Sequence, residues 1–226
     1  MKKAASYFCS SVGRKQLVAL SGIGLTLFVL GHVTGNFLMF IGPEAYNRYG
    51  HGIVTNPLIY VVELGLVALF AAHLLIALKL QVENFLARPV RYAVIPNGAK
   101  RTSVTARTLW LQGLVIAVFS ILHLITFKFG PAEAEGYQVT YNGVVMRDLF
   151  RLLYEVFQQP VYVVWYLIAL VVLGFHLWHG VPSSLQSLGF NHPKYTACLK
   201  KIGAGLAIYV SLGFIAQPLY LYFFYR

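Results

Sequence analysis

Four histidines lie inside long apolar segments of the sequence, one in each segment. They are His32, His73, His123 and His176. A histidine is costly inside an apolar helix, so each is a candidate functional residue, although a single one is also explained as a hydrogen-bonded packing residue. Imidazole nitrogens bind transition metals and haem iron. Chemistry at these residues depends on which of them the fold brings together.

The segments that carry the histidines are long enough to cross a bilayer, which takes about 20 apolar residues. The 226-residue chain is 58% hydrophobic and 11% charged, and its mean hydropathy is +0.67. Each span must be helical, because lipid offers the backbone no hydrogen-bond partner. The sequence therefore predicts an all-α integral membrane protein, a single domain over residues 1–226. Its five transmembrane helices are predicted at Leu17–Ile41, Pro57–Leu80, Thr108–Phe127, Pro160–Val181 and Ile202–Phe224.

The net charge of +11 reflects membrane topology and does not indicate a nucleic-acid partner. Thirteen of the eighteen basic residues fall on one side of the predicted spans, and by the positive-inside rule this side is the cytoplasm. The N-terminus is then cytoplasmic and the C-terminus lies outside. The thirteen are Lys2, Lys3, Arg14, Lys15, Lys79, Arg88, Arg91, Lys100, Arg101, Arg107, Lys194, Lys200 and Lys201.

The depths of the four histidines sort them into two pairs. A helix rises about 1.5 Å per residue, so His32 and His123 each lie roughly 22 Å from the cytoplasmic ends of their helices. His73 and His176 each lie roughly 24 Å inward from the outer ends of theirs. The sequence therefore predicts an outer pair, His32 with His123, and an inner pair, His73 with His176.

Two histidines that face each other from different helices can hold haem iron through its axial positions. Such ligation leaves no open coordination position, so the iron carries electrons and does not bind oxygen. Zinc fits less well, because it takes a tight tetrahedron of four ligands and clustered thiolates are absent here. We therefore expect a four-helix bundle of the first four spans with two haems b, one at each level, and the fifth helix beside it.

The histidine motifs resemble those of a known family, the single-chain, five-helix, two-haem cytochrome b anchor of succinate dehydrogenases and fumarate reductases. The matching stretches are "LGHVTGNF", "AAHLLIALK", "ILHLITF" and "GFHLWHG", and they cover the first four spans. The family tends to have glycines four and thirteen residues after its fourth ligand, which here are Gly180 and Gly189. This spacing favours His176 as the ligand, with His179, one turn away, as the competing residue.

The resemblance implies partners that the chain itself does not contain. It implies a cytoplasmic iron–sulfur subunit, a flavoprotein subunit with FAD, and menaquinone in the membrane, with a dimer of such heterotrimers as one allowed arrangement. The chain would then carry the quinone site of a succinate:quinone oxidoreductase or quinol:fumarate reductase, and not the dicarboxylate site. A haem b anchor of another respiratory oxidoreductase, of the hydrogenase or formate dehydrogenase type, is the alternative. A transporter with structural histidines is a further one.

Two features of the family are not clearly reproduced. Some members carry a glutamate two residues before the fourth ligand, proposed to move protons, and this chain has Gly174 there. Residues that hold the haem propionates are also not evident. The local candidates are His179, Ser21, Arg14, Gln16, Arg107 and Gln112.

The quinone site implied by the resemblance lies near the outer haem and needs a group that exchanges protons. Glu63 is the only acid well inside a span, so it should be paired or have a raised pKa. It is either a proton acceptor for quinol or a residue bonded to a neighbouring helix. His51 and Tyr46, in the connection between the first two helices, are further candidates.

Three connections carry additional signals. Asn142-Gly143 predicts a hairpin turn, and Met146–Phe157 has the apolar spacing of an amphipathic helix, either interfacial or simply on the protein surface. The basic stretch Asn84–Ser103 is either a solvated loop or a docking loop for a cytoplasmic partner. His192, beside Pro193, is expected to be solvated or at the partner interface.

Overall fold

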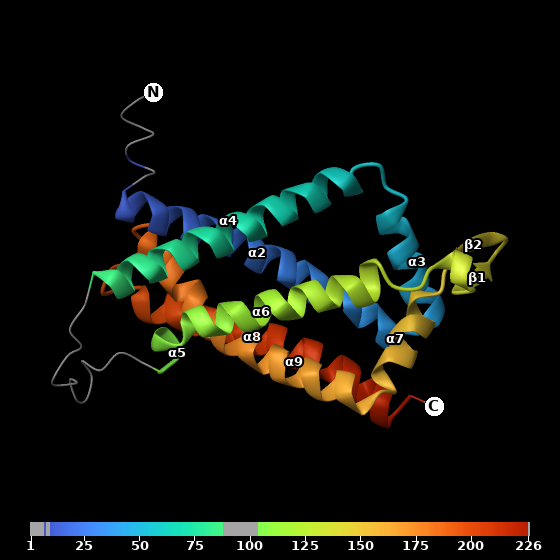
Figure 1. Ribbon diagram of the computed structural model, residues 1–226. Helices are drawn as coiled ribbons and strands as arrows, with labels where there is room; N and C mark the ends of the chain where they lie inside the picture. The colour runs from blue at the N-terminus through green and yellow to red at the C-terminus, as the bar shows by residue number, and fades with distance from the viewer. Residues whose placement is uncertain (1–6, 8–9, 88–103, 226) are drawn as a thin grey trace.

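The structure is a computed structural model that describes residues 7, 10–87 and 104–225 (Figure 1). Five of its helices are long and apolar enough to cross a membrane, as predicted. They include α2 (Ser11–Asn36), α4 (Ile59–Leu86) and α6 (Leu109–His123), followed by α8 (Pro160–Ser187) and α9 (Thr196–Phe223). Two of the spans end irregularly: α2 continues as the 3₁₀-helix η1 (Phe37–Phe40) and α6 as the π-helix η3 (Leu124–Lys128).

The helices extend past their predicted limits at one end of the bundle, which we call the basic end. There α2 begins six residues early, α4 and α8 each end six residues late, and α9 begins six residues early. Polar sequence continues these helices because it is capped and paired: Ser10 accepts a hydrogen bond from Gly13 N, and Arg14 pairs with Glu83 at 2.5 Å. We call the opposite end the hairpin end.

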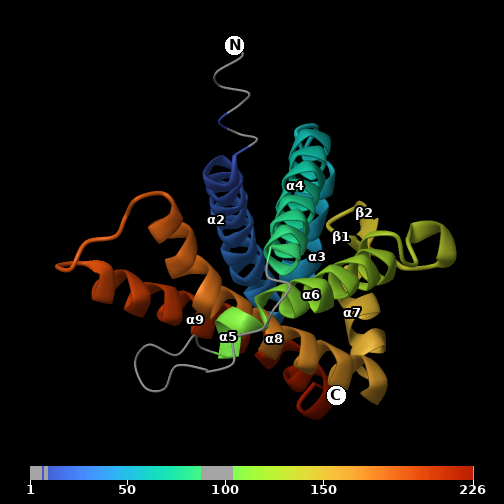
Figure 2. The same cartoon turned by 60° about the vertical axis from the view of Figure 1, so that its left-hand side comes forward.

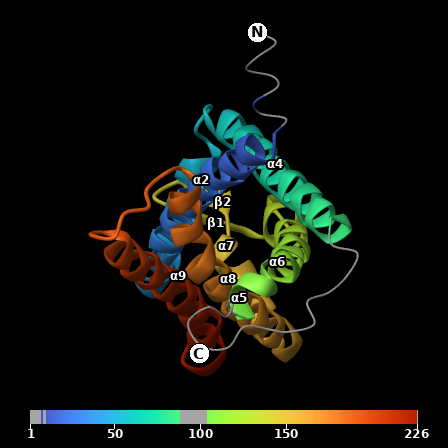
Figure 3. The same cartoon turned by 90° about the vertical axis from the view of Figure 1, so that its left-hand side faces the viewer.

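The first four spanning helices form a ring. Helix α2 contacts α4 and α8, and α6 contacts the same two, while α9 packs outside against α8 and α2 (Figure 3). Small residues allow the close contacts: a Cβ on Gly203 would lie 2.7 Å from the ring of Pro182, which is itself inside α8. Helix α4 has a mean hydropathy of 2.4 and no buried residue, so its apolar surface needs a lipid-like environment.

Three small elements gather with α3 (Pro43–Val54) at the hairpin end (Figures 1 and 2). They are the strands β1 (Gln138–Tyr141) and β2 (Val144–Arg147), and the helix α7 (Leu149–Phe157). The short helix α5 (Val104–Arg107) lies at the basic end, and the 3₁₀ turn η4 (Glu133–Glu135) precedes β1. The strands pair antiparallel, with Gln138 opposite Arg147. Asn142 and Gly143 both have positive φ, 52° and 78°, so the predicted two-residue hairpin turn is present.

The structure differs from the sequence analysis at this end in two respects. The connection between the first two spans contains the helix α3, which begins at a proline in the first helical position. The amphipathic helix does not begin at Met146, because Met146 and Arg147 pair in the hairpin and Asp148 caps α7 by accepting from Arg151 N. The apolar face of α7 is covered by protein and not by lipid, since Phe150 and Phe157 are only 4% and 3% exposed.

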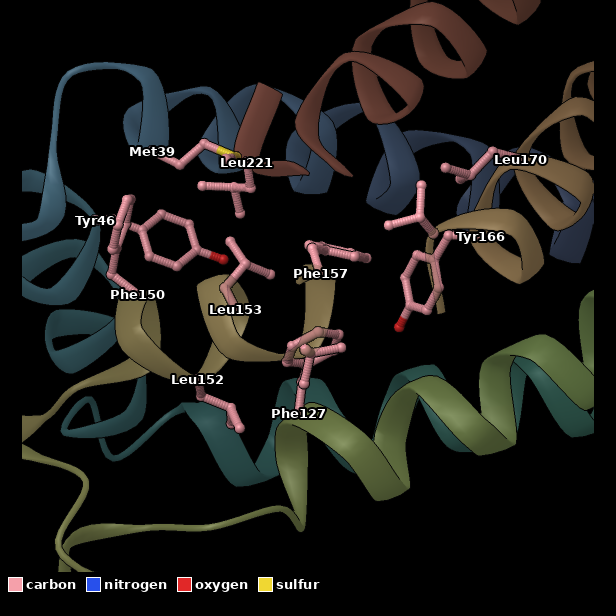
Figure 4. Packing of buried hydrophobic residues seen from close by; sticks show 12 residues of the cluster. Met39, Tyr46, Phe127, Phe150, Leu152, Leu153, Phe157, Tyr166, Leu170 and Leu221 are labelled. Atoms are coloured by element: carbon pink, nitrogen blue, oxygen red, sulfur yellow. The ribbon is translucent and has the colours of Figure 1, made fainter. Parts of the chain in front are cut away.

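A mainly aromatic and aliphatic core lies where α7 meets the ends of the long helices (Figure 4). Tyr166 of α8 packs edge-on against Phe157, with ring centroids 4.9 Å apart, and both contact Phe127 of η3. Asn47 of α3, 1% exposed, donates to Asp148 Oδ1 at 2.9 Å and accepts from Phe150 N at 2.8 Å. Helix α7 and the residues packed on it therefore fix the hairpin ends of α6 and α8. These two helices carry His123 and His176.

Candidate functional site

The four membrane histidines meet in two pairs inside the ring of helices. The ring centroids of His32 (α2) and His123 (α6) are 5.9 Å apart, with an interplanar angle of 82°. Those of His73 (α4) and His176 (α8) are 6.5 Å apart, at 74°. These are the same two pairs that the depth estimate groups together, and each pair joins opposite helices of the ring.

The separation within each pair has two explanations. Edge-to-face packing of two rings gives centroid distances of about 4.5–7 Å. A metal-bound imidazole nitrogen lies about 2.0–2.1 Å from the metal, so two opposed imidazoles on one metal have centroids about 6 Å apart. In residues 10–87 and 104–225 no group of three or more His, Cys, Asp or Glu side chains could hold a metal ion. The donor set therefore does not fit zinc, but it fits a metal whose other ligands come from a macrocycle.

The inner histidine His73 is oriented by helix α2. Its Nδ1 lies 3.1 Å from Val18 O and 3.1 Å from Ser21 Oγ. A carbonyl oxygen only accepts, so Nδ1 carries the proton and Nε2 keeps its lone pair for a ligand. Ser21 also donates to its own helix at Leu17 O, 2.8 Å away. Ser21 was a propionate candidate, but the structure places its hydroxyl against His73.

The outer histidines contact polar side chains that sequence reasoning did not assign to them. Asn36 Nδ2 lies 3.2 Å from His32 Nδ1, and Asn36 Oδ1 accepts from Tyr46 Oη at 2.8 Å. His123 Nδ1 lies 3.1 Å from Tyr166 Oη. Tyr46 was a quinone candidate, and it is 7% exposed in this network. Burial, and then the neighbouring Tyr49, raise the pKa of Tyr46 above its usual value, so it stays a neutral hydroxyl.

The π-helix η3 directly after His123 was not predicted. A π-helical turn is rare and frequently occurs at functional sites. It follows a histidine that already faces His32, and it ends at Lys128, which forms an ion pair with Glu63 of α4. Glu63 is therefore bonded to a neighbouring helix, which is one of its two predicted roles. Apolar spacing does not reveal this turn, because the turn lies at the end of the span and no further apolar turn follows that would show the change in phase.

The structure distinguishes the neighbours His176 and His179. His176 faces His73, and its Nδ1 is buried without a hydrogen-bond partner among the described residues. His179 is partly buried and makes no ring contact or hydrogen bond within the described part of the chain. The imidazole pair at the inner level is therefore His73 with His176.

The remaining propionate candidates lie toward the basic end. Arg14 is bound to Glu83, and Gln16 Oε1 accepts from Tyr7 Oη at 2.6 Å. Arg107 is exposed in α5. Gln112 is 9% exposed, and its amide nitrogen donates to Thr108 Oγ1 at 2.8 Å. In the described part of the chain, no hydrogen bond or ion pair joins any two of these four residues.

The glycines near the fourth histidine differ in their surroundings. A Cβ on Gly174 would lie 2.8 Å from Ser211 Oγ, so this glycine permits the contact of α8 with α9. Gly174, the position at which some members of the resembled family carry a glutamate, therefore faces α9. No described atom lies within 4 Å of the Cβ position of Gly180, so no packing contact in the described part of the chain accounts for this glycine. Gly189 ends α8 with φ +97°, a conformation that favours glycine.

A groove and a smaller cavity lie at the hairpin end. The groove, of about 340 Å³, lies between η3, α7 and the start of α8. Its polar lining includes Thr126, Tyr137, Glu155 and Gln159. The cavity, of about 70 Å³, is lined by the quinone candidate His51 together with residues of α3, η4 and β2. The structure does not bring His51 into contact with either histidine pair.

The carboxylate in the groove is held by two partners. Tyr137 Oη donates to Glu155 Oε2 at 2.5 Å, and Arg151 Nε donates to Oε1 at 2.7 Å. The Tyr137 hydroxyl, and then the Arg151 guanidinium, lower the pKa of Glu155 below its usual value, so the group is ionised at neutral pH.

The described part of the basic end carries Lys194, Lys200 and Lys201, and His192 stacks on Tyr195 with ring centroids 5.1 Å apart. Most of the predicted docking loop Asn84–Ser103 lies outside the described residues. Comparison with known proteins identified no relative: no protein-family model, no curated protein and no solved structure matches the chain.

Proposed function

We propose that this chain is a membrane electron-transfer subunit that holds two haems b, one between each histidine pair. The observation that carries the proposal is the presence of two opposed histidine pairs at two depths, each with the ring separation of imidazoles on one metal. A protein without a cofactor has no evident need for four such residues in an apolar bundle. When bound, haem b would supply one-electron redox chemistry.

The chain's residues would orient and protect this chemistry. Val18 and Ser21 hold His73 with its Nε2 lone pair free, and Tyr166 Oη can accept from His123 Nδ1–H in the same way. Such second partners fix the tautomer and the orientation of a metal-binding histidine. Asn36 is not a partner of this kind for His32, because its Nδ2 is a donor that also bonds His32 O at 2.8 Å. The apolar ring of helices would exclude water, and the two histidines at each level would hold the iron.

The proposed orientation places the basic end in the cytoplasm by the positive-inside rule. The basic residues there, with the sequence resemblance, support an iron–sulfur subunit as the docking partner, which in turn would bind a flavoprotein subunit with FAD. The chain would then be the anchor of a succinate:quinone oxidoreductase or quinol:fumarate reductase in the cytoplasmic membrane.

A quinone headgroup would bind in the groove at the hairpin end. The volume, about 340 Å³, falls in the range of small-molecule sites, about 300–1,000 Å³. Thr126 lies three residues after His123, and Tyr162 lies one turn from Tyr166, so the groove begins about one turn from the outer pair. Glu155 lines this groove and Glu63 does not, so Glu155 is the nearer carboxylate to a quinone bound there. Both carboxylates are held in ion pairs, Glu155 with Arg151 and Glu63 with Lys128, so either would have to leave its partner to accept a proton from quinol.

The test is a spectrum of the purified full-length protein. A dithionite-reduced minus oxidised spectrum should show haem b, and the haem content should be two per chain. His73→Ala should reduce this to one, because the outer pair does not depend on that ligand. His192→Ala, a histidine outside the spans, is the matched control and should retain two.

Absence of haem, or one haem per wild-type chain, would contradict the two-haem proposal. The subunits that co-purify in mild detergent identify the complex. A covalent flavin supports the succinate or fumarate enzyme, whereas nickel or molybdenum supports the hydrogenase or formate dehydrogenase type.

A further inference from the structure

Three buried side-chain atoms in the described part of the chain have no hydrogen-bond partner there. They are Oε1 of Gln112, Nε1 of Trp165 and Nδ1 of His176. Buried polar atoms are almost always hydrogen-bonded, so each of these needs a partner. All three lie on α6 and α8, the helices that contribute His123 and His176.

A common spacing relates polar residues to the histidines on three helices. Ser21 precedes His32 by eleven residues on α2, and Gln112 precedes His123 by eleven on α6. Trp165 precedes His176 by the same number on α8. Eleven residues are about three helical turns, so the two side chains of each set lie within about 20° of one face and about 16 Å apart along the axis.

Helix α2 shows what this spacing does. His32 belongs to the outer pair, and Ser21, eleven residues away on the same face, contacts His73 of the inner pair. Because His123 also belongs to the outer pair, the same spacing directs Gln112 toward the inner pair. The neighbouring Gly113 shows that this part of α6 lies at the level of the inner pair, since a Cβ on Gly113 would lie 3.9 Å from His176 Cε1.

The hydrogen bonds of Gln112 determine which of its atoms is available. The amide nitrogen donates to Thr108 Oγ1 at 2.8 Å and to Thr105 O at 3.4 Å. A backbone carbonyl cannot donate, so the amide nitrogen must face it and Oε1 is left as an acceptor. An acceptor oxygen would repel an ionised haem propionate. The side chain of Gln112 is therefore better suited to accept a hydrogen bond from a buried donor than to bind a haem propionate, its predicted role.

We infer that Gln112 is a positioning residue for His176: its Oε1 accepts a hydrogen bond that comes from His176 Nδ1–H through one buried water. The inference rests on the proposed function, because binding of Nε2 to iron requires the proton on Nδ1. His176 then gains the kind of partner that Val18 O provides for His73. A single water is a common bridge between two buried polar groups that otherwise lack partners.

Such a partner makes the imidazole more basic and favours ferric over ferrous iron. Loss of a second partner of this kind typically weakens metal binding about 10- to 100-fold. A tenfold change in the ratio of ferric to ferrous affinity corresponds to about 59 mV in a one-electron potential. The inner haem potential is therefore a direct measure of this hydrogen bond.

The experiment is a redox titration of the full-length protein with Gln112→Leu and Gln112→Glu. The leucine variant removes the acceptor and should raise the inner haem potential by about 59 mV or more. The glutamate variant is a stronger acceptor and should lower it. The outer haem should not respond to either. Gln217→Leu is the matched control, because Gln217 is 5% exposed and donates to Gly213 O of its own helix.

The inner haem is identified as the one lost in His73→Ala. Opposite shifts in the two variants support the inference, since a packing defect alone would not reverse sign with the acceptor. If the leucine variant does not fold, the glutamate variant decides. A lowered potential of the inner haem in Gln112→Glu supports the inference, and an unchanged potential overturns the inference. A two-haem wild-type protein with no response to either variant overturns this inference alone, whereas a wild-type protein without haem overturns the proposed function as well.

Discussion

Replacing Gly22 by alanine would place a methyl group against the inner histidine pair. A Cβ there lies 3.1 Å from His73 Cε1 and 3.5 Å from Ser184 Oγ. The usual contact between carbon atoms is about 3.5–4.0 Å, so the imidazole must move away from α2 by at least about 0.4 Å. The residues that hold His73, Val18 and Ser21, are on α2 as well, so this movement lengthens both of their hydrogen bonds.

The size of the effect follows from these two bonds. Both are 3.1 Å long, and a movement of about 0.4 Å takes them close to the limit for a hydrogen bond. Hydrogen bonds between membrane helices average about 0.6 kcal/mol, so losing two costs about 1.2 kcal/mol. That energy corresponds to roughly an eightfold loss of affinity at the inner site.

The assay is retention of haem during exchange into detergent that contains an excess of a haem-binding protein, followed by a redox titration of the remaining haem. Gly22→Ala should release the inner haem roughly eightfold more readily and leave the outer one in place. Gly113→Ala is the matched control, because its Cβ would be 3.9 Å from His176 Cε1, an ordinary contact. Equal retention in Gly22→Ala and Gly113→Ala would refute the reasoning.

Three further predictions concern the parts that support the site. Asn47→Ala leaves the buried amide of Phe150 without its acceptor, so the melting temperature should fall by the equivalent of about 1–3 kcal/mol; an unchanged melting temperature would contradict this. Because the pKa of Glu155 is lowered, the stability it provides is present above the usual glutamate pKa and is lost as pH falls through the lowered value. Glu155→Gln should therefore flatten the acid side of the stability profile, and an identical profile would argue against the pairing. Gly174→Ala should destabilise the protein by about 1–3 kcal/mol, because the new methyl group would contact Ser211. A second substitution, Ser211→Gly, should restore stability, whereas Ser211→Ala should not, because the Cβ of Ser211 itself lies 2.9 Å from the new methyl group.

The helical spans were predictable because an apolar run of membrane length has only one backbone solution. Their ends were not, since the polar turns at the basic end are stabilised by tertiary contacts such as that of Arg14 with Glu83. Helix α3 was missed for a similar reason. Its sequence, "PEAYNRYGHGIV", contains two glycines, and burial of Tyr46 and Asn47 against α7 stabilises the helix.

The histidine pairs were predictable because depth depends only on residue count and helix direction, both of which the sequence contains. Their polar partners were not predictable in the same way. Tyr166 reaches His123 from α8, and Tyr46 reaches Asn36 from α3, so both contacts depend on how helices rotate against each other. The ion pair of Lys128 with Glu63 depends in addition on the π-helical turn, because Lys128 is the last residue of that turn and its place around the helix axis differs from that in a regular α-helix.

Under the proposed function, the eleven-residue spacing would keep two haem sites apart within one bundle. An α-helix returns to nearly the same face after four, seven, eleven or eighteen residues. Seven residues separate two levels by only about 10 Å, and eighteen by about 27 Å, which would place both sites at the surfaces of a bilayer core about 30 Å thick. Eleven residues give about 16 Å and leave each site about 7 Å from the nearer surface.

This separation also decides what each end of the bundle can reach. With Ser21 and Gln112 at the inner level, that site would lie about 7 Å from the surface of the bilayer core on the side of the basic end, where a soluble electron donor or acceptor would dock. With Trp165 at the outer level, the other site is equally close to the groove at the hairpin end. A shift of one residue between Ser21 and His32 would rotate one of them by about 100° away from the interior, so under the proposed function the spacing would be constrained by haem binding as well as by packing.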